Sequence, residues 1–132
     1  MSLTDNERKI VVDLELEKAQ KTFRELDVLM NARMWNTAAN RLYYALFHAV
    51  SALLINDGRA VKSHRGVLAQ FGQYYVREGI FSRDDGRILS ELVIMRDNAD
   101  YNCFYEAAEE NVQSYIAPVR DLIEKIRNYI TP

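Results

Sequence analysis

The 132-residue chain has little of what interrupts a helix, with five glycines and two prolines. Their scarcity favours long helices over a turn-rich β fold. One cysteine, Cys103, excludes an internal disulfide, and no run of about 18 apolar residues is present that could span a membrane. Residues 1–7 lack the basic and apolar regions of a signal peptide. We therefore expect a cytoplasmic protein without a membrane segment.

The chain also lacks a large excess of charge of either sign. Its net charge is −2, which does not indicate a general polyanion binder. The charges are unevenly placed, because residues 59–96 hold seven basic and four acidic side chains, whereas residues 97–132 hold three basic and seven acidic ones. This imbalance predicts either a local basic face or the ordinary variation of solvated helices.

The hydrophobic pattern predicts helices throughout. Residues 5–32 carry one apolar stripe at alternating spacings of four and three, and Thr4 with Glu7 forms a capping box at its start. Residues 36–55 are apolar almost all the way round, which indicates a helix at the centre of a bundle or in an oligomer interface.

Three further helices are expected. One begins after Ser63 and ends near Gly79, and the next begins after Ser82, which forms a capping box with Asp85. The last spans residues 105–129, with a kink or a break at Pro118 because proline has no N–H to donate. Residues 1–132 are thus predicted to form one all-α domain, an antiparallel bundle of four to five helices.

A line of polar side chains crosses the apolar second helix. Arg41, Tyr44, His48 and Ser51 are separated by three, four and three residues, so they share one side. Buried polar groups need partners. The line is therefore either the wall of a binding site or a set of hydrogen-bonded residues that fix the packing of the helix.

The fourth helix carries Arg96, Asp97, Asp100 and Tyr101. Arg96 and Asp100 are four residues apart, so their side chains can meet. A half-buried arginine oriented by a carboxylate is well suited to binding phosphate. A structural ion pair is the alternative interpretation.

Basic residues also gather where the third helix begins, at Lys62, Ser63, His64 and Arg65. Backbone N–H groups and cations at a helix start can bind an anion, although a solvated cap has the same composition. The two histidines and the cysteine have no spacing typical of a metal site, so we expect no metal and no other cofactor.

Three stretches resemble the HEPN family of helical proteins. AANRLYYALFHAVSALL, residues 38–54, resembles the second helix of bacterial HEPN domains. KSHRGVLAQF, residues 62–71, and RDNADY, residues 96–101, resemble the following segment and the Arg-x-x-x-Asp-Tyr motif of one branch of that family. The three lie in the order that the family shows.

The resemblance implies a bundle that dimerises, with a cleft where the motif helices of two protomers meet. Many HEPN proteins are metal-independent ribonucleases, often toxins paired with a small nucleotidyltransferase, and others are non-catalytic partners that bind nucleotide or RNA. This implies catalytic roles for Arg96, Asp100 and Tyr101. The ligand-binding candidates are Arg41, Tyr44, His48, Lys62 and His64.

The chain departs from the ribonuclease pattern at one point. In those members four to six residues separate the arginine from a histidine that follows it, but Tyr101, Asn102 and Cys103 occupy the corresponding positions. None of these side chains replaces imidazole as a group that takes up and releases a proton near pH 7. The hypotheses are a binding protein of a toxin–antitoxin or defence system, an active ribonuclease toxin, and a structural dimerisation module. His48 or His64 could serve catalysis only if folding brings it near Arg96.

Overall fold

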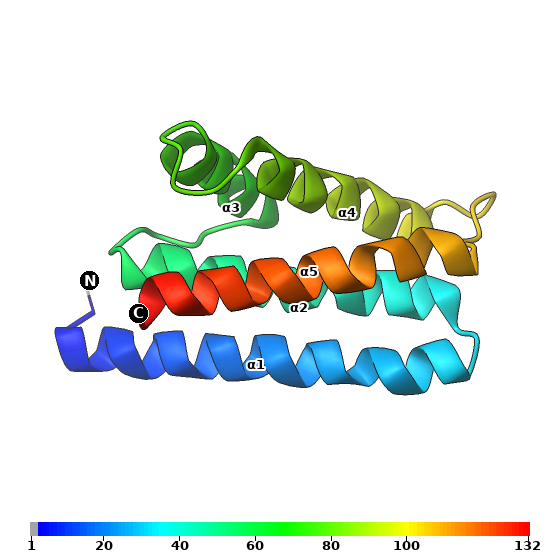
Figure 1. The fold of residues 1–132 in the computed structure, drawn as a ribbon, viewed down its shortest axis with the longest axis horizontal. Helices are drawn as coiled ribbons and strands as arrows, with labels where there is room; N and C mark the ends of the chain where they lie inside the picture. Colours follow the sequence, from blue (N-terminus) through cyan, green and yellow to red (C-terminus); the bar gives the residue numbers. More distant parts are fainter. Residues whose placement is uncertain (1–2) are drawn as a thin grey trace.

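The computed structural model describes residues 3–132, which form a bundle of five α-helices without a β-strand (Figure 1). The helices are α1 (Asp5–Asn31), α2 (Trp35–Asn56), α3 (His64–Phe71), α4 (Arg83–Tyr101) and α5 (Glu109–Ile130). In Figure 1, α1 and α4 run in one direction, and α2 and α5 run in the other. The predicted all-α bundle is confirmed.

The helix α2 lies at the centre of the bundle. It contacts α1, α3, α4 and α5, and in Figure 1 it lies beside α5, between α1 on one side and the pair α3 and α4 on the other. Twelve of its 22 residues are buried. Many of them are small, which lets the neighbouring helices approach closely; these are Ala38, Ala39, Ala45, Ala49 and Ala52. The almost wholly apolar surface of this helix is therefore explained by its central position.

Side chains end-cap three helices as the sequence predicts. The Thr4 hydroxyl accepts from the Glu7 N–H at 3.1 Å, and the Glu7 carboxylate accepts from the Thr4 N–H at 2.8 Å. Ser82 and Asp85 form the same reciprocal pair before α4, and the Ser63 hydroxyl accepts a backbone N–H at the start of α3. Each pair satisfies N–H groups that a helix start leaves without partners.

The third helix differs from the prediction in its second half. Its α-helical part ends at Phe71, and a π-helical turn, Gly72–Val76, follows. The chain then reverses at Gly79, whose φ of +78° suits a residue without a side chain. Backbone N–H groups of Ile80 and Phe81 both donate to the Tyr75 carbonyl, at 2.9 and 3.0 Å, and hold this turn closed.

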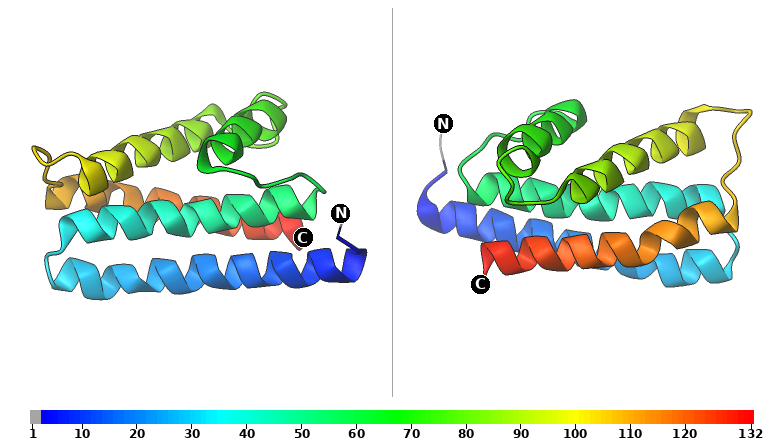
Figure 2. Two further views of the ribbon diagram at one scale, coloured as in Figure 1. Left: turned by 180° about the vertical axis from the view of Figure 1, so that it is seen from behind. Right: turned by 45° about the horizontal axis from the view of Figure 1, so that its top comes forward.

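The fifth helix begins at Glu109, four residues later than predicted. The chain before it is extended because the Ala107 N–H donates to the Asn36 side chain, 2.8 Å away at the start of α2. Of the kink or break predicted at Pro118, the break does not occur, since α5 continues through this residue. The right-hand view of Figure 2 shows the first turns of α5 bending away from the rest of the helix, so the missing hydrogen bond is accommodated without a break.

Candidate functional site

Arg96 lies on the face of α4 that packs against α2. Its side chain is 16% exposed. The guanidinium donates to the Tyr44 hydroxyl at 2.8 Å and to the Asp97 carboxylate at 3.0 Å. Its Nε lies 3.1 Å from Oδ2 of Asp100 but makes no well-directed hydrogen bond. Arg96 is thus held from three sides and stays partly open to solvent.

Asn40 joins the carboxylate of Asp100 to α2. Its amide nitrogen donates to Asp100 Oδ2 at 2.8 Å, and its amide oxygen accepts from Arg41 Nε and Nη2 at 2.9 and 2.6 Å. The sequence interpretation missed Asn40. The available signal was a helix-disfavouring asparagine inside a long apolar helix, four residues before Tyr44 and so on the same side.

Aromatic rings surround the two arginines. The guanidinium carbon of Arg96 lies 5.6, 5.3 and 5.4 Å from the ring centres of Tyr43, Tyr44 and Tyr101. The guanidinium carbon of Arg41 lies 5.3 Å from the Tyr44 ring centre. These distances are in the range of cation–π attraction, which favours guanidinium groups beside aromatic faces. Arg41 and Arg96 therefore share the ring of Tyr44.

The first residue of α3, His64, reaches the same aromatic cluster. Its ring stacks on Phe47 with centres 4.4 Å apart and an angle of 15°. Its Nδ1 lies 2.8 Å from the Tyr43 hydroxyl, within hydrogen-bond distance, and its ring meets Tyr44 edge-on at 5.6 Å. His64 is otherwise exposed. Folding therefore brings a histidine from α3 beside the residues that hold Arg96.

The protonation states follow from this packing. Partial burial of the ring lowers the pKa of His64 below its ordinary value, and the Arg96 charge lowers it further. Burial raises the pKa of Tyr43 to about 12, although Arg96 opposes the effect. At neutral pH the site accordingly holds a cationic Arg96, a neutral imidazole and a neutral phenol.

The polar line of α2 divides between two sides of the bundle. Arg41 and Tyr44 belong to the cluster just described. The His48 ring borders this cluster, with its centre 6.4 Å from that of Tyr44, but its Nδ1 lies 3.2 Å from the Glu15 carboxylate of α1. Ser51 is 1% exposed and its hydroxyl has no hydrogen-bond partner. The interpretation of this line as a site wall thus fits its first half, and neither interpretation accounts for Ser51.

Three other predicted site features lie at or beyond the edge of the cluster. Lys62 is exposed in the connection before α3 and makes no side-chain hydrogen bond or ion pair with any of residues 3–132. The Ser63 hydroxyl accepts from the Gly66 N–H at 2.9 Å, so this helix start already has an internal partner. Tyr101 is 76% exposed at the end of α4. The cluster is an open surface, which suits an extended ligand better than an enclosed small molecule.

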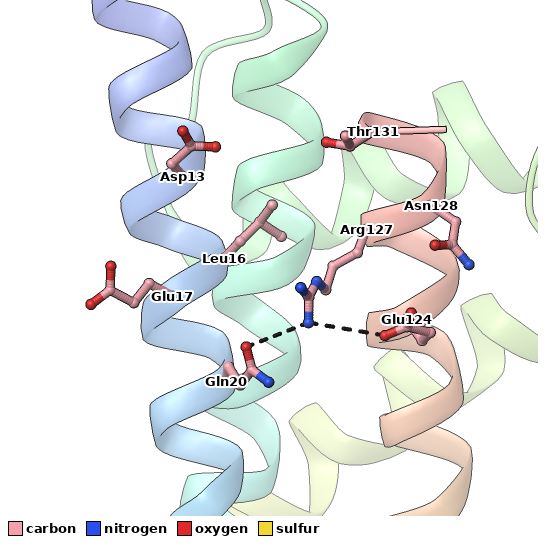
Figure 3. A pocket seen from close by; sticks show the side chains of 8 residues that line it. All are labelled: Asp13, Leu16, Glu17, Gln20, Glu124, Arg127, Asn128 and Thr131. Carbon is pink, nitrogen blue, oxygen red and sulfur yellow. Dashed lines mark hydrogen bonds and ion pairs between the residues drawn. The ribbon is translucent and has the colours of Figure 1, made fainter.

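A separate groove lies between α1 and α5 (Figure 3). Arg127 points across it, donating to Gln20 of α1 at 3.4 Å and lying 4.0 Å from Glu124. The contact with Gln20 ties α5 to α1, whereas the pair with Glu124 lies within α5. The groove shares no residue with the Arg96 cluster.

Two chemical properties of residues 3–132 bear on the kind of site. They contain no group of three or more histidine, cysteine or carboxylate side chains placed to hold a metal ion. None of their helices is both long and apolar enough to cross a bilayer.

Comparison with known proteins extends over nearly the whole chain. The HEPN domain model matches residues 12–129. The UPF0332 protein of Thermotoga maritima is 30% identical over 125 residues, which is 95% of each chain. A Methanocaldococcus jannaschii protein that is named provisionally as a toxin is 31% identical over 85% of this chain and 83% of its own. The UPF0332 protein of Archaeoglobus fulgidus is 25% identical over 90% of this chain and 94% of its own.

Proposed function

Because the chain belongs to the HEPN domain family, we propose that it is a toxin-type HEPN protein whose Arg96 cluster binds the phosphodiester backbone of RNA. The observation that supports this most is the arrangement of Arg96 and Arg41 on one tyrosine ring at an open surface. The toxin names of two Methanocaldococcus jannaschii relatives support the same biological class.

The geometry suits phosphate chemically. A guanidinium presents paired N–H groups that match two phosphate oxygens. Asp97, whose side chain is 55% exposed, is the partner of Arg96 that a phosphate would replace. Asp100 is held by Asn40 and keeps Arg96 oriented while this exchange takes place.

Exposed aromatic surface beside the arginines suits a single-stranded nucleic acid. Tyr101 is 76% exposed, with its ring centre 5.4 Å from the Arg96 guanidinium carbon. Unpaired bases stack on such rings, and this stacking contributes about 1–3 kcal/mol per base. Backbone contact at Arg96 and base stacking at Tyr101 together favour single-stranded RNA over duplex.

The test is RNA affinity, measured by fluorescence anisotropy with a labelled single-stranded RNA. Arg96→Ala should weaken binding about tenfold or more, because a charge-assisted contact is lost. Arg87→Ala is the matched control, since Arg87 also lies on α4 but pairs with Asp84 and Glu91. Equal losses in the two variants would contradict a specific role for Arg96, and absence of RNA binding by the wild-type protein would overturn the proposed function.

The proposed oligomer is a homodimer formed through the end of α4. Three large apolar side chains are exposed there, Ile94 at 63%, Tyr101 at 76% and Phe104 at 96%. Covering such a patch stabilises association because apolar area leaves water. Pairing two copies at this patch would also place their Arg96 clusters near each other, in keeping with the dimers of the family.

The proposed partner is a small nucleotidyltransferase that silences the protein through Tyr101. The phenol oxygen would attack the α-phosphate of a nucleoside triphosphate, with release of pyrophosphate and loss of the phenolic proton to solvent. The added nucleotide would cover Arg96, since the Tyr101 ring is its neighbour. Mass spectrometry after co-expression with the nucleotidyltransferase from a neighbouring gene should find Tyr101 modified, and an unmodified Tyr101 would count against this partnership.

A further inference from the structure

The motif on α4 has a phosphate-binding group but no group that moves a proton near neutral pH. Cleavage of RNA through its 2′-hydroxyl requires a base for that hydroxyl and stabilisation of charge on phosphate. Arg96 can supply the second. Tyr101, Asn102 and Cys103 follow it, and none of these is an imidazole.

We propose that His64, from the start of α3, is the catalytic base of this site and that the protein is a ribonuclease. The inference rests on the RNA-binding function proposed above. His64 and Arg96 flank the same two rings. Relative to the Tyr44 ring centre, the Arg96 guanidinium carbon lies at 5.3 Å and the His64 ring centre at 5.6 Å. Relative to the Tyr43 ring centre, they lie at 5.6 and 5.9 Å.

The ring of His64 is held in one orientation. Phe47 stacks on its face at 4.4 Å, and the Tyr43 hydroxyl lies 2.8 Å from Nδ1. Tyr43 is itself 2% exposed and cannot easily shift. When Nδ1–H donates to the Tyr43 oxygen, Nε2 is the unprotonated nitrogen and is free to accept a proton. The Tyr43 hydroxyl can accept from Nδ1–H or donate to Nδ1, and the proposed reaction uses the first of these two arrangements.

The reaction balances with groups on the protein and solvent water. Nε2 of His64 takes the proton of the 2′-hydroxyl, and the 2′-oxygen forms a bond to the adjacent phosphorus. Arg96 stabilises the charge that develops on the phosphate oxygens. The bond from phosphorus to the 5′-oxygen of the next nucleotide breaks, and that oxygen takes a proton from water. The products are a 2′,3′-cyclic phosphate and a 5′-hydroxyl, and the imidazolium then returns its proton to solvent.

The other candidates for the base fit less well. His48 lies 3.2 Å from the Glu15 carboxylate, on the side of α2 that faces α1. Tyr44 already accepts a hydrogen bond from Arg96 at 2.8 Å. Phenols ordinarily titrate near pH 10 and hold their protons at pH 7. His64 is the histidine that combines exposure, a fixed orientation and proximity to Arg96.

The test is cleavage of a labelled single-stranded RNA by the full chain with chelator present. His64→Gln should lower the rate about 100-fold or more, the usual contribution of a general base, and should leave RNA affinity within about twofold. Arg87→Gln is the matched control and should cleave as the wild type does, since Arg87 pairs with Asp84 and Glu91. His48→Gln tests the other histidine and should lower the rate far less than His64→Gln does, because His48 pairs with Glu15 and acts on His64 only through its charge. A substrate with a 2′-deoxy nucleotide at the cleaved position should remain intact, and wild-type products should end in a cyclic phosphate.

A second variant keeps the proposal testable if glutamine disturbs the cluster. His64→Ala should regain cleavage when imidazole is added, because free imidazole can replace the missing ring, whereas a purely structural defect would not respond. Cleavage by His64→Gln at the wild-type rate would overturn the proposal. So would a wild-type protein that binds RNA without cleaving it, a result that leaves the proposed RNA binding intact.

Discussion

The Arg96 guanidinium donates a hydrogen bond of 2.8 Å to the Tyr44 hydroxyl, a residue 52 positions earlier in the chain. This contact joins α4 to α2 and sets the direction in which Arg96 points. The same Tyr44 ring also lies beside Arg41 and His64. The candidate site therefore depends on how α2 and α4 pack. A change at Tyr44 should lower RNA affinity more than it lowers the stability of the fold.

Replacing Tyr44 with phenylalanine should separate these two effects. The ring remains and its hydroxyl is lost, so RNA affinity should fall about three- to tenfold while the free energy of unfolding falls by about 1 kcal/mol. Anisotropy and urea denaturation measure the two quantities. Tyr74→Phe is the control, because the Tyr74 ring centre lies 3.7 Å from the Arg59 guanidinium carbon and its hydroxyl makes no hydrogen bond within the part of the chain that the structure describes. An unchanged RNA affinity in Tyr44→Phe would show that this contact does not orient Arg96 for binding.

The proposed base predicts the pH dependence of cleavage. Its pKa is lowered from 6.5, so His64 is unprotonated at neutral pH and the rate should fall only as pH drops below that ordinary value. Burial of the ring is the main cause of this lowered pKa. The charged or titratable groups that face His64 are Arg96, Asp97, His48 and Tyr43.

Asp97→Asn provides the internal check on that profile. The Asp97 carboxylate raises the pKa of His64, so its neutralisation should move the inflection to lower pH. Asp84→Asn on the first turn of α4 should leave the inflection where it is. An inflection above pH 6.5 in the wild type would argue against His64 as the titrating base. So would an inflection that is at the same pH in Asp97→Asn as in the wild type.

The stability of the bundle should depend on the ionisation of Asp85. This carboxylate caps α4 and accepts from Lys125 of α5 at 2.6 Å. Burial raises its pKa, but the hydrogen bonds from Lys125 and Ser82 outweigh that effect and hold the pKa below 3.8. Because the pKa is lower in the folded state, ionised Asp85 stabilises the fold at pH values above its ordinary pKa. This contribution is lost as the pH falls through the lowered pKa of the folded state.

Asp85→Asn should consequently lower the free energy of unfolding by about 1–2 kcal/mol at pH 7. The difference from wild type should shrink as the pH is lowered from 5 to 2.5, as measured by urea denaturation. Asp121→Asn serves as the control, since that carboxylate is 77% exposed and lies 3.7 Å from Arg120. A difference that stays constant with pH would indicate that the charge of Asp85 contributes nothing.

The proposed dimer predicts a change in mass when its apolar patch gains a charge. Ile94→Lys should convert a dimer into a monomer at micromolar concentration, because an unpaired charge in a buried interface is unfavourable. Light scattering coupled to gel filtration measures this. Ile10→Lys is the matched control, since Ile10 is 59% exposed on α1, a helix that does not contact α4. A wild-type protein that is already monomeric would remove the dimer from the proposal.

The helices and their starts could be read from local sequence. Capping boxes at Thr4 and Ser82 and the turn at Gly79 involve residues within a few positions of one another. The later start of α5 could not be read in this way, because it depends on the bond from the Ala107 N–H to Asn36, two segments that meet only after folding. The π-helical turn after Phe71 likewise had no signal in the periodicity.

By itself the sequence determined an all-helical bundle, a second helix with an almost wholly apolar surface and an arginine motif that lacks its histidine. These follow from the spacing of apolar side chains and from residue identity, which are local properties. Only the tertiary structure decided which polar residues meet. Packing of α3 and α4 against α2 brings His64 to the rings that hold Arg96, and packing of α1 against α2 pairs His48 with Glu15. The neighbour that a side chain meets depends on how whole helices pack together, and residue spacing within one helix does not specify that packing.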